Sequence, residues 1–288
     1  MKGLRNFLCR HPIAALLLLF IPCIAIALVL CYLQIIDLYV ALIALVWAFF
    51  LISLPIRRMP QSVMREAALA LERDLDPDAF LSLMELLRAR RSQNLAYNAS
   101  IGANYAAGLD AKGAYGEALS HMRELARTRP SLDVVSGVQF DLSYAVVALH
   151  SEEGRGEIPG VLATVRAALP VLPPALATAV RETAESVRMA YAVYTESESP
   201  STLIHYYVGA INRYRAEGDM GRRRLMRSCM NLAMVYDRAG RDSDAAAMYA
   251  YVAENGGALG IVREAKDARA ALSLRASAAQ MQAANEGM

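Results

Sequence analysis

Residues 12–56 read PIAALLLLFIPCIAIALVLCYLQIIDLYVALIALVWAFFLISLPI, an almost wholly apolar stretch. Its two strongly polar side chains, Gln34 and Asp37, lie together near the middle. One continuous helix would be roughly 68 Å long at about 1.5 Å per residue, whereas the hydrocarbon core of a bilayer is roughly 30 Å thick. The stretch therefore predicts two apolar helices, over 13–30 and 38–54, joined by a short turn into a membrane-spanning hairpin.

Basic residues flank this stretch on both sides, and the turn between the two predicted helices carries none. They are Lys2, Arg5 and Arg10 before the stretch and Arg57 and Arg58 after it. Because Lys and Arg beside a span remain on the cytoplasmic side, we expect both chain termini in the cytoplasm. The predicted localisation is the cytoplasmic (inner) membrane, with a cytoplasmic basic tail over 1–11 and the transmembrane hairpin over 12–56.

A cleaved secretory signal is the other interpretation of the N-terminus. The basic tail fits it, and Ala25-Ile26-Ala27 matches a small-x-small cleavage site. That site lies inside the apolar run, however, and Leu28-Val29-Leu30 continue directly after it. The sequence therefore favours a retained anchor.

Several residues of the predicted anchor have two interpretations. We expect Asp37 in the wet turn, and the alternative is an intramembrane functional carboxylate. Pro22 predicts a kink in the first span. Arg57, Arg58 and Arg65 are candidate contacts for anionic lipid headgroups, and the alternative is that they only determine topology.

Composition limits the classes of function. The formal charge of +2 arises from the N-terminal tail, so the rest of the chain is neutral and argues against nucleic acid as a ligand. After the hairpin the bases are almost all arginine, and alanine is abundant, which indicates a GC-rich bacterial genome. Cys229 is the one cysteine beyond the hairpin, so neither a disulfide framework nor a metal cluster is predicted.

The chain after the hairpin has regular helical patterning interrupted by glycine and proline, and no alternating strand with a partner. The prediction is an all-α fold, with a juxtamembrane helix over 57–75 that begins at Pro60 and a helical repeat domain over 76–288. A helix start is expected at Asp76-Pro77. Further helices are expected near 94–109, 114–128, 135–150, 158–169, 174–196, 201–216, 222–239, 242–255 and 258–284.

Two segments have related patterns of large and small residues. The first contains Tyr105, Ala106, Leu109, Gly113, Ala118, Met122 and Pro130, and the second contains Leu232, Ala233, Tyr236, Gly240, Ala245 and Tyr249. Both resemble the tetratricopeptide repeat (TPR) family, in which small residues let two antiparallel helices approach. The resemblance covers about 225–258 and 99–131, and it implies a TPR-like α-solenoid capped by the final helix. A compact helical bundle is the alternative.

The resemblance also implies a concave groove for a protein partner. Asn104 and Asn231 occupy the place where some members hold a peptide backbone, and Arg227 lies one turn before Asn231 on the same face. Arg223 and Arg224 add positive charge at the start of that helix, against its dipole. These five residues are the candidate partner-binding site. The other interpretation of the arginines is a solvated face paired with nearby acids. Aromatic residues at helical spacing fill interhelix packing by default, and the alternative is that they line the groove; these residues are Tyr191, Tyr194, Tyr206, Tyr207 and Tyr214.

No familiar catalytic or cofactor-binding motif occurs in the sequence. We therefore expect no cofactor and no enzymatic activity. The predicted function is a membrane-anchored cytoplasmic scaffold for protein–protein interaction. The first alternative is an accessory subunit of a membrane transport or secretion complex, for which Asp37 and Pro22 are the sequence hints, and the second is a membrane-bound enzyme of an unfamiliar type.

Overall fold

The computed structural model describes residues 7–8, 11–90 and 92–286. The chain divides into two compact units. The first consists of Met1–Ala67 and Ser82–Ser92, and the second of Ala68–Leu81 and Gln93–Met288.

The first unit contains a hairpin of two long apolar helices, α2 (Pro12–Tyr32) and the first part of α3 (Leu38–Glu72). Both are long and apolar enough to cross a membrane by length and composition. The rings of Phe20 and Phe49 meet edge to face, with their centroids 5.6 Å apart, so the two helices lie against each other. The predicted pair of apolar helices is confirmed, and Asp37 is exposed in the turn between them.

Buried and exposed residues in this hairpin differ in size. The buried ones include Ala15, Ala27, Ala41 and Ser53, while the large apolar side chains around them are exposed. Small residues between helices and large apolar residues outside are typical of helices packed in lipid, where the outer surface needs no water contact.

The expected juxtamembrane helix does not begin at Pro60. Instead, α3 continues through Pro55 and Pro60 as far as Glu72. A proline inside a helix removes one hydrogen bond to the preceding turn. The residues that follow are good helix formers, and Val63, Ala67 and Leu71 are buried among them, so a new helix start is not needed.

After a turn, α4 (Pro77–Arg88) begins as the sequence predicts. The Asp76 carboxylate accepts a hydrogen bond from the backbone N–H of Ala79 at 2.9 Å. This bond satisfies one of the unpaired N–H groups at the start of the helix.

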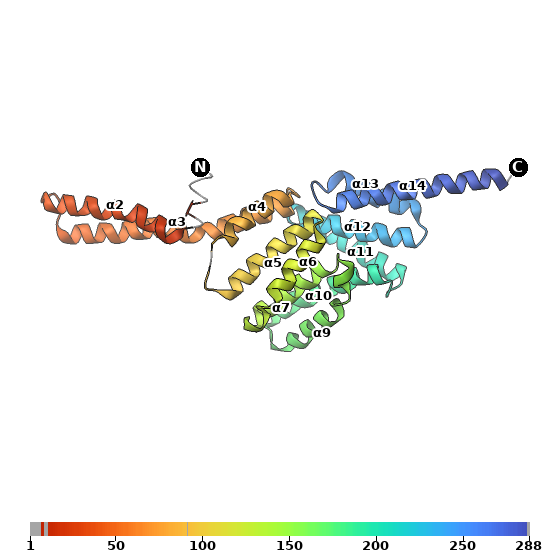
Figure 1. Cartoon of the computed structure of the whole chain (residues 1–288), viewed down its shortest axis with the longest axis horizontal. Helices are drawn as coiled ribbons and strands as arrows, with labels where there is room; N and C mark the ends of the chain where they lie inside the picture. Colours follow the sequence, from red (N-terminus) through yellow and green to blue (C-terminus); the bar gives the residue numbers. More distant parts are fainter. Residues whose placement is uncertain (1–6, 9–10, 91, 287–288) are drawn as a thin grey trace. The chain divides into compact units, whose positions relative to one another are not determined.

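The rest of the second unit consists of α-helices that pack mainly against neighbours in sequence, as α5 does on α6 and α12 on both α11 and α13 (Figure 1). They are α5 (Leu95–Lys112), α6 (Tyr115–Ala126), α7 (Val134–Ala148), α8 (Glu152–Arg155), α9 (Ile158–Ala168), α10 (Pro174–Thr195), α11 (Pro200–Ala216), α12 (Arg222–Arg238), α13 (Asp242–Asn255) and α14 (Ile261–Glu286). No strand occurs in the described part of the chain. The predicted all-α fold is therefore confirmed, with each predicted helix found close to its expected bounds.

Side-chain caps explain several of these helix starts. Asn94, Asp133 and Ser199 each accept a hydrogen bond from a backbone N–H in the first turn of α5, α7 and α11. At the opposite end, Gly113 terminates α5 with a φ of 87°, a left-handed conformation that glycine adopts without strain.

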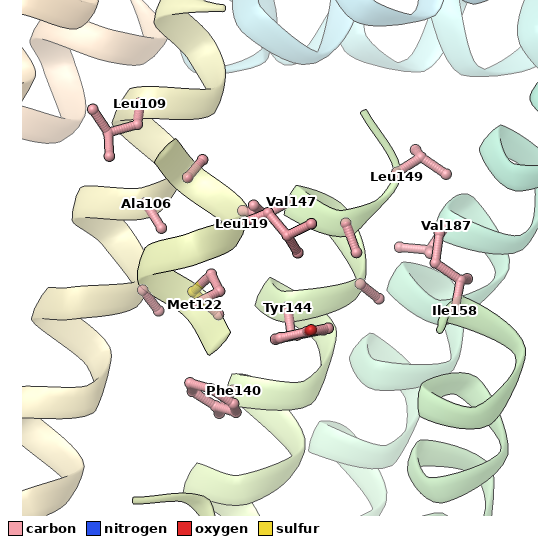
Figure 2. Packing of buried hydrophobic residues seen from close by; sticks show 14 of the residues in the cluster. Ala106, Leu109, Leu119, Met122, Phe140, Tyr144, Val147, Leu149, Ile158 and Val187 are labelled. Carbon is pink, nitrogen blue, oxygen red and sulfur yellow. The ribbon is translucent and has the colours of Figure 1, made fainter. Parts of the chain in front are cut away.

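The main hydrophobic core joins α5, α6, α7, α9 and α10 (Figure 2). Ala106 of α5 and Met122 of α6 are fully buried in it, as is Val147 of α7. Ile158 of α9 and Val187 of α10 extend the same cluster. Small residues let the helices approach, and large ones fill the remaining space.

Segments from the two ends of the second unit meet. The backbone N–H of Gly260, between α13 and α14, donates to the carbonyl of Ala111 near the end of α5 at 2.8 Å. A Cβ added to Gly113 would lie 3.2 Å from the Cα of Gly260, so the two backbones are in close contact. The Tyr115 hydroxyl of α6 also donates to the Glu264 carboxylate of α14. The helices therefore enclose a space between them, as in the compact-bundle alternative.

We expect Met122→Ala to lower the free energy of unfolding by about 2–5 kcal/mol, because it leaves a cavity in the main core. The matched control is Met281→Ala on the exposed surface of α14, with an expected change below about 0.5 kcal/mol. Denaturant unfolding of the full chain in detergent, followed by circular dichroism, measures both. Equal effects of the two substitutions would contradict the packing described for Met122.

Candidate functional site

A pocket of about 390 Å³ lies inside the second unit. It forms where the consecutive helices α10 and α11 separate, and α12 and the ends of α5 and α7 complete its walls. Its charged and aromatic lining consists of Arg213, Arg223, Arg224, Arg227, Tyr206, Tyr207, Tyr214, Asp110, His150, Glu182 and Glu217. Val187, Leu259 and Ile261 add apolar walls.

Three of these arginines come from the first turns of α12, where positive charge opposes the helix dipole. Nearby carboxylates offset that cost. Arg223 donates to Glu72 at 2.7 Å, and Arg224 donates to Glu217 at 2.6 Å. The arginines are therefore paired with acids, as one interpretation of the sequence expected, and they also line the pocket.

Arg227 and Arg213 are less fully engaged by acids. The nearest atoms of Arg227 and Asp110 are 3.7 Å apart, which is an ion pair but too long for a hydrogen bond. The Arg213 guanidinium lies over the Tyr214 ring, 5.3 Å from its centroid. A guanidinium has five N–H donors, so both groups keep donors available for a ligand.

The deepest polar contact in the pocket is between Asp110 and His150. The Asp110 carboxylate accepts from Nδ1 of His150 at 2.5 Å, and the two side chains are only 3% and 5% exposed. Burial lowers the pKa of His150, and the Arg227 charge lowers it further against the opposing effect of Asp110. Burial alone would raise the pKa of Asp110, but His150 and Arg227 outweigh it and hold that pKa below its usual value. The charged partners are therefore Asp110 and Arg227, with His150 neutral.

This arrangement fixes the tautomer of His150. Because Nδ1 carries the proton that it donates to Asp110, Nε2 is left as an acceptor. Nε2 is buried and has no hydrogen-bond partner among the described residues.

Asn231 presents a second buried acceptor to the same pocket. Its Nδ2 donates to the Tyr207 hydroxyl at 3.0 Å, and burial raises the pKa of that hydroxyl, so Tyr207 is neutral. The Asn231 side-chain carbonyl oxygen, Oδ1, has no partner in the described part of the chain, although the residue is only 3% exposed. Buried polar atoms are seldom left unpaired, so both acceptors call for a hydrogen-bond donor that the described residues do not supply.

Of the candidate partner-binding residues, Arg223, Arg224, Arg227 and Asn231 line this pocket together. Asn104 lies outside it, and its Nδ2 donates to the Ser100 carbonyl of its own helix at 2.9 Å. Tyr206, Tyr207 and Tyr214 line the pocket, whereas Tyr191 and Tyr194 pack against the main core. The candidate lipid contacts Arg57, Arg58 and Arg65 are exposed on α3 in the first unit.

Sequence reasoning missed Asp110 and His150 as a pair. They are 40 residues apart and belong to different helices, so no local spacing joins them. One signal was present in the sequence. Asp110 is the only charged residue in the run AAGLDA (106–111), and a charged side chain on a helix face that is predicted to be buried needs a partner.

Neither a metal site nor a protein family helps to assign a function to this pocket. No group of three His, Cys, Asp or Glu side chains able to hold a metal ion occurs among the described residues. No protein-family model, curated protein or solved structure matches this chain. The pocket must therefore be interpreted from its own chemistry.

We expect the free energy of unfolding to fall as the pH drops below about 6.5. Because the pKa of folded His150 lies below its usual 6.5, the unfolded chain takes up this proton first, and stability is lost on acidification. In His150→Gln, whose amide still donates to Asp110, the loss between about pH 7 and pH 5 should be smaller. Thermal unfolding at several pH values tests this, and identical pH profiles for the two proteins would contradict a neutral buried His150.

Proposed function

We propose that this protein is a membrane-anchored cytoplasmic scaffold, whose TPR-like helical unit holds a protein partner. The observation that carries the proposal is the pocket lined by arginine and tyrosine. These residue types are enriched where protein interfaces concentrate their binding energy, because both combine a large contact surface with directed hydrogen bonding.

The hairpin of the first unit supports the membrane anchor. Ile21 and Val46 lie near the middle of the two apolar segments and are exposed, as are most large apolar side chains around them. Such a surface is unfavourable in water and suits a hydrocarbon environment. Arg57 and Arg58, which follow the second apolar segment, favour a cytoplasmic location for the helical unit.

Two helix pairs support the TPR-like assignment. In α5–α6, Ala106 and Ala118 are fully buried, and in α12–α13 the same holds for Ala233 and Ala245. Glycine with positive φ ends the first helix of the α5–α6 pair and follows α12 in the other. The contact between Ala111 and Gly260 distinguishes this unit from an open solenoid, so the binding surface we propose is the central pocket.

The alternative of a transport or secretion subunit relied on Asp37 and Pro22. Pro22 lies inside α2, but Asp37 is exposed in the turn before α3. A carboxylate at that position needs no role within the lipid phase. The scaffold proposal therefore has the stronger support.

The anchor is tested by placing charge in the hairpin. We expect Ile21→Arg combined with Val46→Arg to release the protein from membranes washed at alkaline pH, because arginine at a span centre costs about 2.5–3.5 kcal/mol. The matched control is Val171→Arg combined with Leu274→Arg, at exposed apolar positions of the helical unit. Fractionation followed by immunoblotting measures membrane retention, and release by the control pair alone would contradict the anchor.

The scaffold is tested by affinity purification of the full chain from native membranes in mild detergent. We expect a stoichiometric protein partner that Asp37→Asn retains and that Arg213→Glu, a charge reversal at the pocket, loses. Quantitative mass spectrometry compares the two variants with the parent protein. Loss with Asp37→Asn and retention with Arg213→Glu would instead place the working interface in the hairpin, as the transport-subunit alternative requires.

A further inference from the structure

Two residues of the pocket lining each carry a buried hydrogen-bond acceptor that has no partner among the described residues. These acceptors are Nε2 of His150 and Oδ1 of Asn231. Nδ1 of His150 is hydrogen-bonded to Asp110, and one N–H of Asn231 Nδ2 is hydrogen-bonded to the Tyr207 hydroxyl. A ligand that satisfies these acceptors must bring N–H or O–H donors.

The arginines of the pocket require hydrogen-bond acceptors from the same ligand. Arg213 and Arg227 retain guanidinium donors after their contacts with Tyr214 and Asp110. Two of the three lining acids are engaged, Asp110 by His150 and Glu217 by Arg224, and the third, Glu182, is exposed. The ligand therefore carries an anionic acceptor, and planar guanidinium groups suit a carboxylate.

An anion without N–H or O–H groups does not meet both requirements. A fully ionised phosphate or a simple carboxylate would satisfy the arginines and leave both buried acceptors unpaired. An aspartate or glutamate residue within a peptide meets both requirements, because its side chain carries the carboxylate and its backbone carries N–H donors.

Size and apolar lining define the peptide further. A volume of about 390 Å³ is near the lower end of the range for ligand pockets, roughly 300–1,000 Å³, so only a short segment is enclosed. Val187, Leu259 and Ile261 give it an apolar wall. An apolar side chain beside the acidic residues would bury surface against them.

We propose that the pocket binds a short acidic peptide segment with an adjacent apolar residue, its carboxylates on Arg213 and Arg227 and its backbone N–H groups on His150 and Asn231. This inference rests on the proposed function and names the chemistry of the partner. The recognised segment is internal to its chain. Side-chain carboxylates and backbone N–H groups make all of the proposed contacts, so no chain terminus is required.

The test uses the full chain in detergent and two peptides blocked at both ends. Acetyl-Glu-Leu-Glu-amide is the probe, and acetyl-Gln-Leu-Gln-amide has nearly the same shape without the charge. We expect the acidic peptide to bind at least about tenfold more tightly, measured by calorimetry or ligand-observed NMR, with added salt reducing the difference. Equal affinities would overturn the proposal.

Variants then locate the site. Arg213→Gln should weaken binding of the acidic peptide about fivefold or more, whereas Arg269→Gln, on the exposed surface of α14, should not change it. Arg213 has no carboxylate partner in the described part of the chain, so its loss should not prevent folding. Asn231→Leu removes one of the two buried acceptors at similar volume and should weaken both peptides by a similar factor. Equal effects of Arg213→Gln and Arg269→Gln would place binding elsewhere.

Two competitors separate the peptide from smaller ligands. Inorganic phosphate and free glutamate should each displace the probe only at concentrations well above its dissociation constant. If either one displaces the probe as effectively as the unlabelled peptide does, the pocket is a site for small anions or amino acids, and the inference is overturned.

If peptide selectivity fails while the stoichiometric partner is still captured, only the ligand chemistry is wrong. If no partner is captured, the scaffold proposal fails by itself.

Discussion

The buried charge of Asp110 is the constraint on which the second unit depends. An ionised carboxylate away from water is stable only when it is paired and hydrogen-bonded. Asp110 on α5 meets this requirement through His150 after α7 and Arg227 on α12. Three segments that are distant in sequence must therefore converge on one point, and helix packing that is otherwise local becomes a closed arrangement.

The pocket follows from that convergence. A linear array of helix pairs would leave its first and last pairs apart, whereas here the end of α5 contacts the backbone that precedes α14. This contact between the two ends of the unit brings the C-terminal ends of α5 and α7 towards the first turns of α12. Because α10 and α11 make few contacts with each other, the space between them is not filled by their own side chains. Polar groups that in an open array would lie on a surface become the walls of a pocket.

The parts of this structure that were predictable from sequence are those determined by neighbours along the chain. The helix start at Asp76-Pro77 was visible because proline and acidic residues favour a first turn, and the face shared by Arg227 and Asn231 follows from their spacing of four. The helix break at Pro60 was wrong, because buried residues on both sides outweigh one lost hydrogen bond. Asn104 and Asn231 matched the same family position, yet only Asn231 reaches the pocket, since that depends on contacts across the whole unit.

The two unpaired acceptors bear on why the pocket remains polar. His150 and Asn231 each use one polar atom to hold the structure together, and the other is buried without a partner in the described part of the chain. An apolar lining of the same shape would be no less stable, because replacing both partners of a buried hydrogen bond by apolar groups is often neutral. Retaining buried acceptors without intramolecular donors is thus unfavourable for the empty protein, and the imbalance is relieved by a partner that supplies N–H or O–H groups. The same two residues that help to close the fold therefore also select what the pocket can hold.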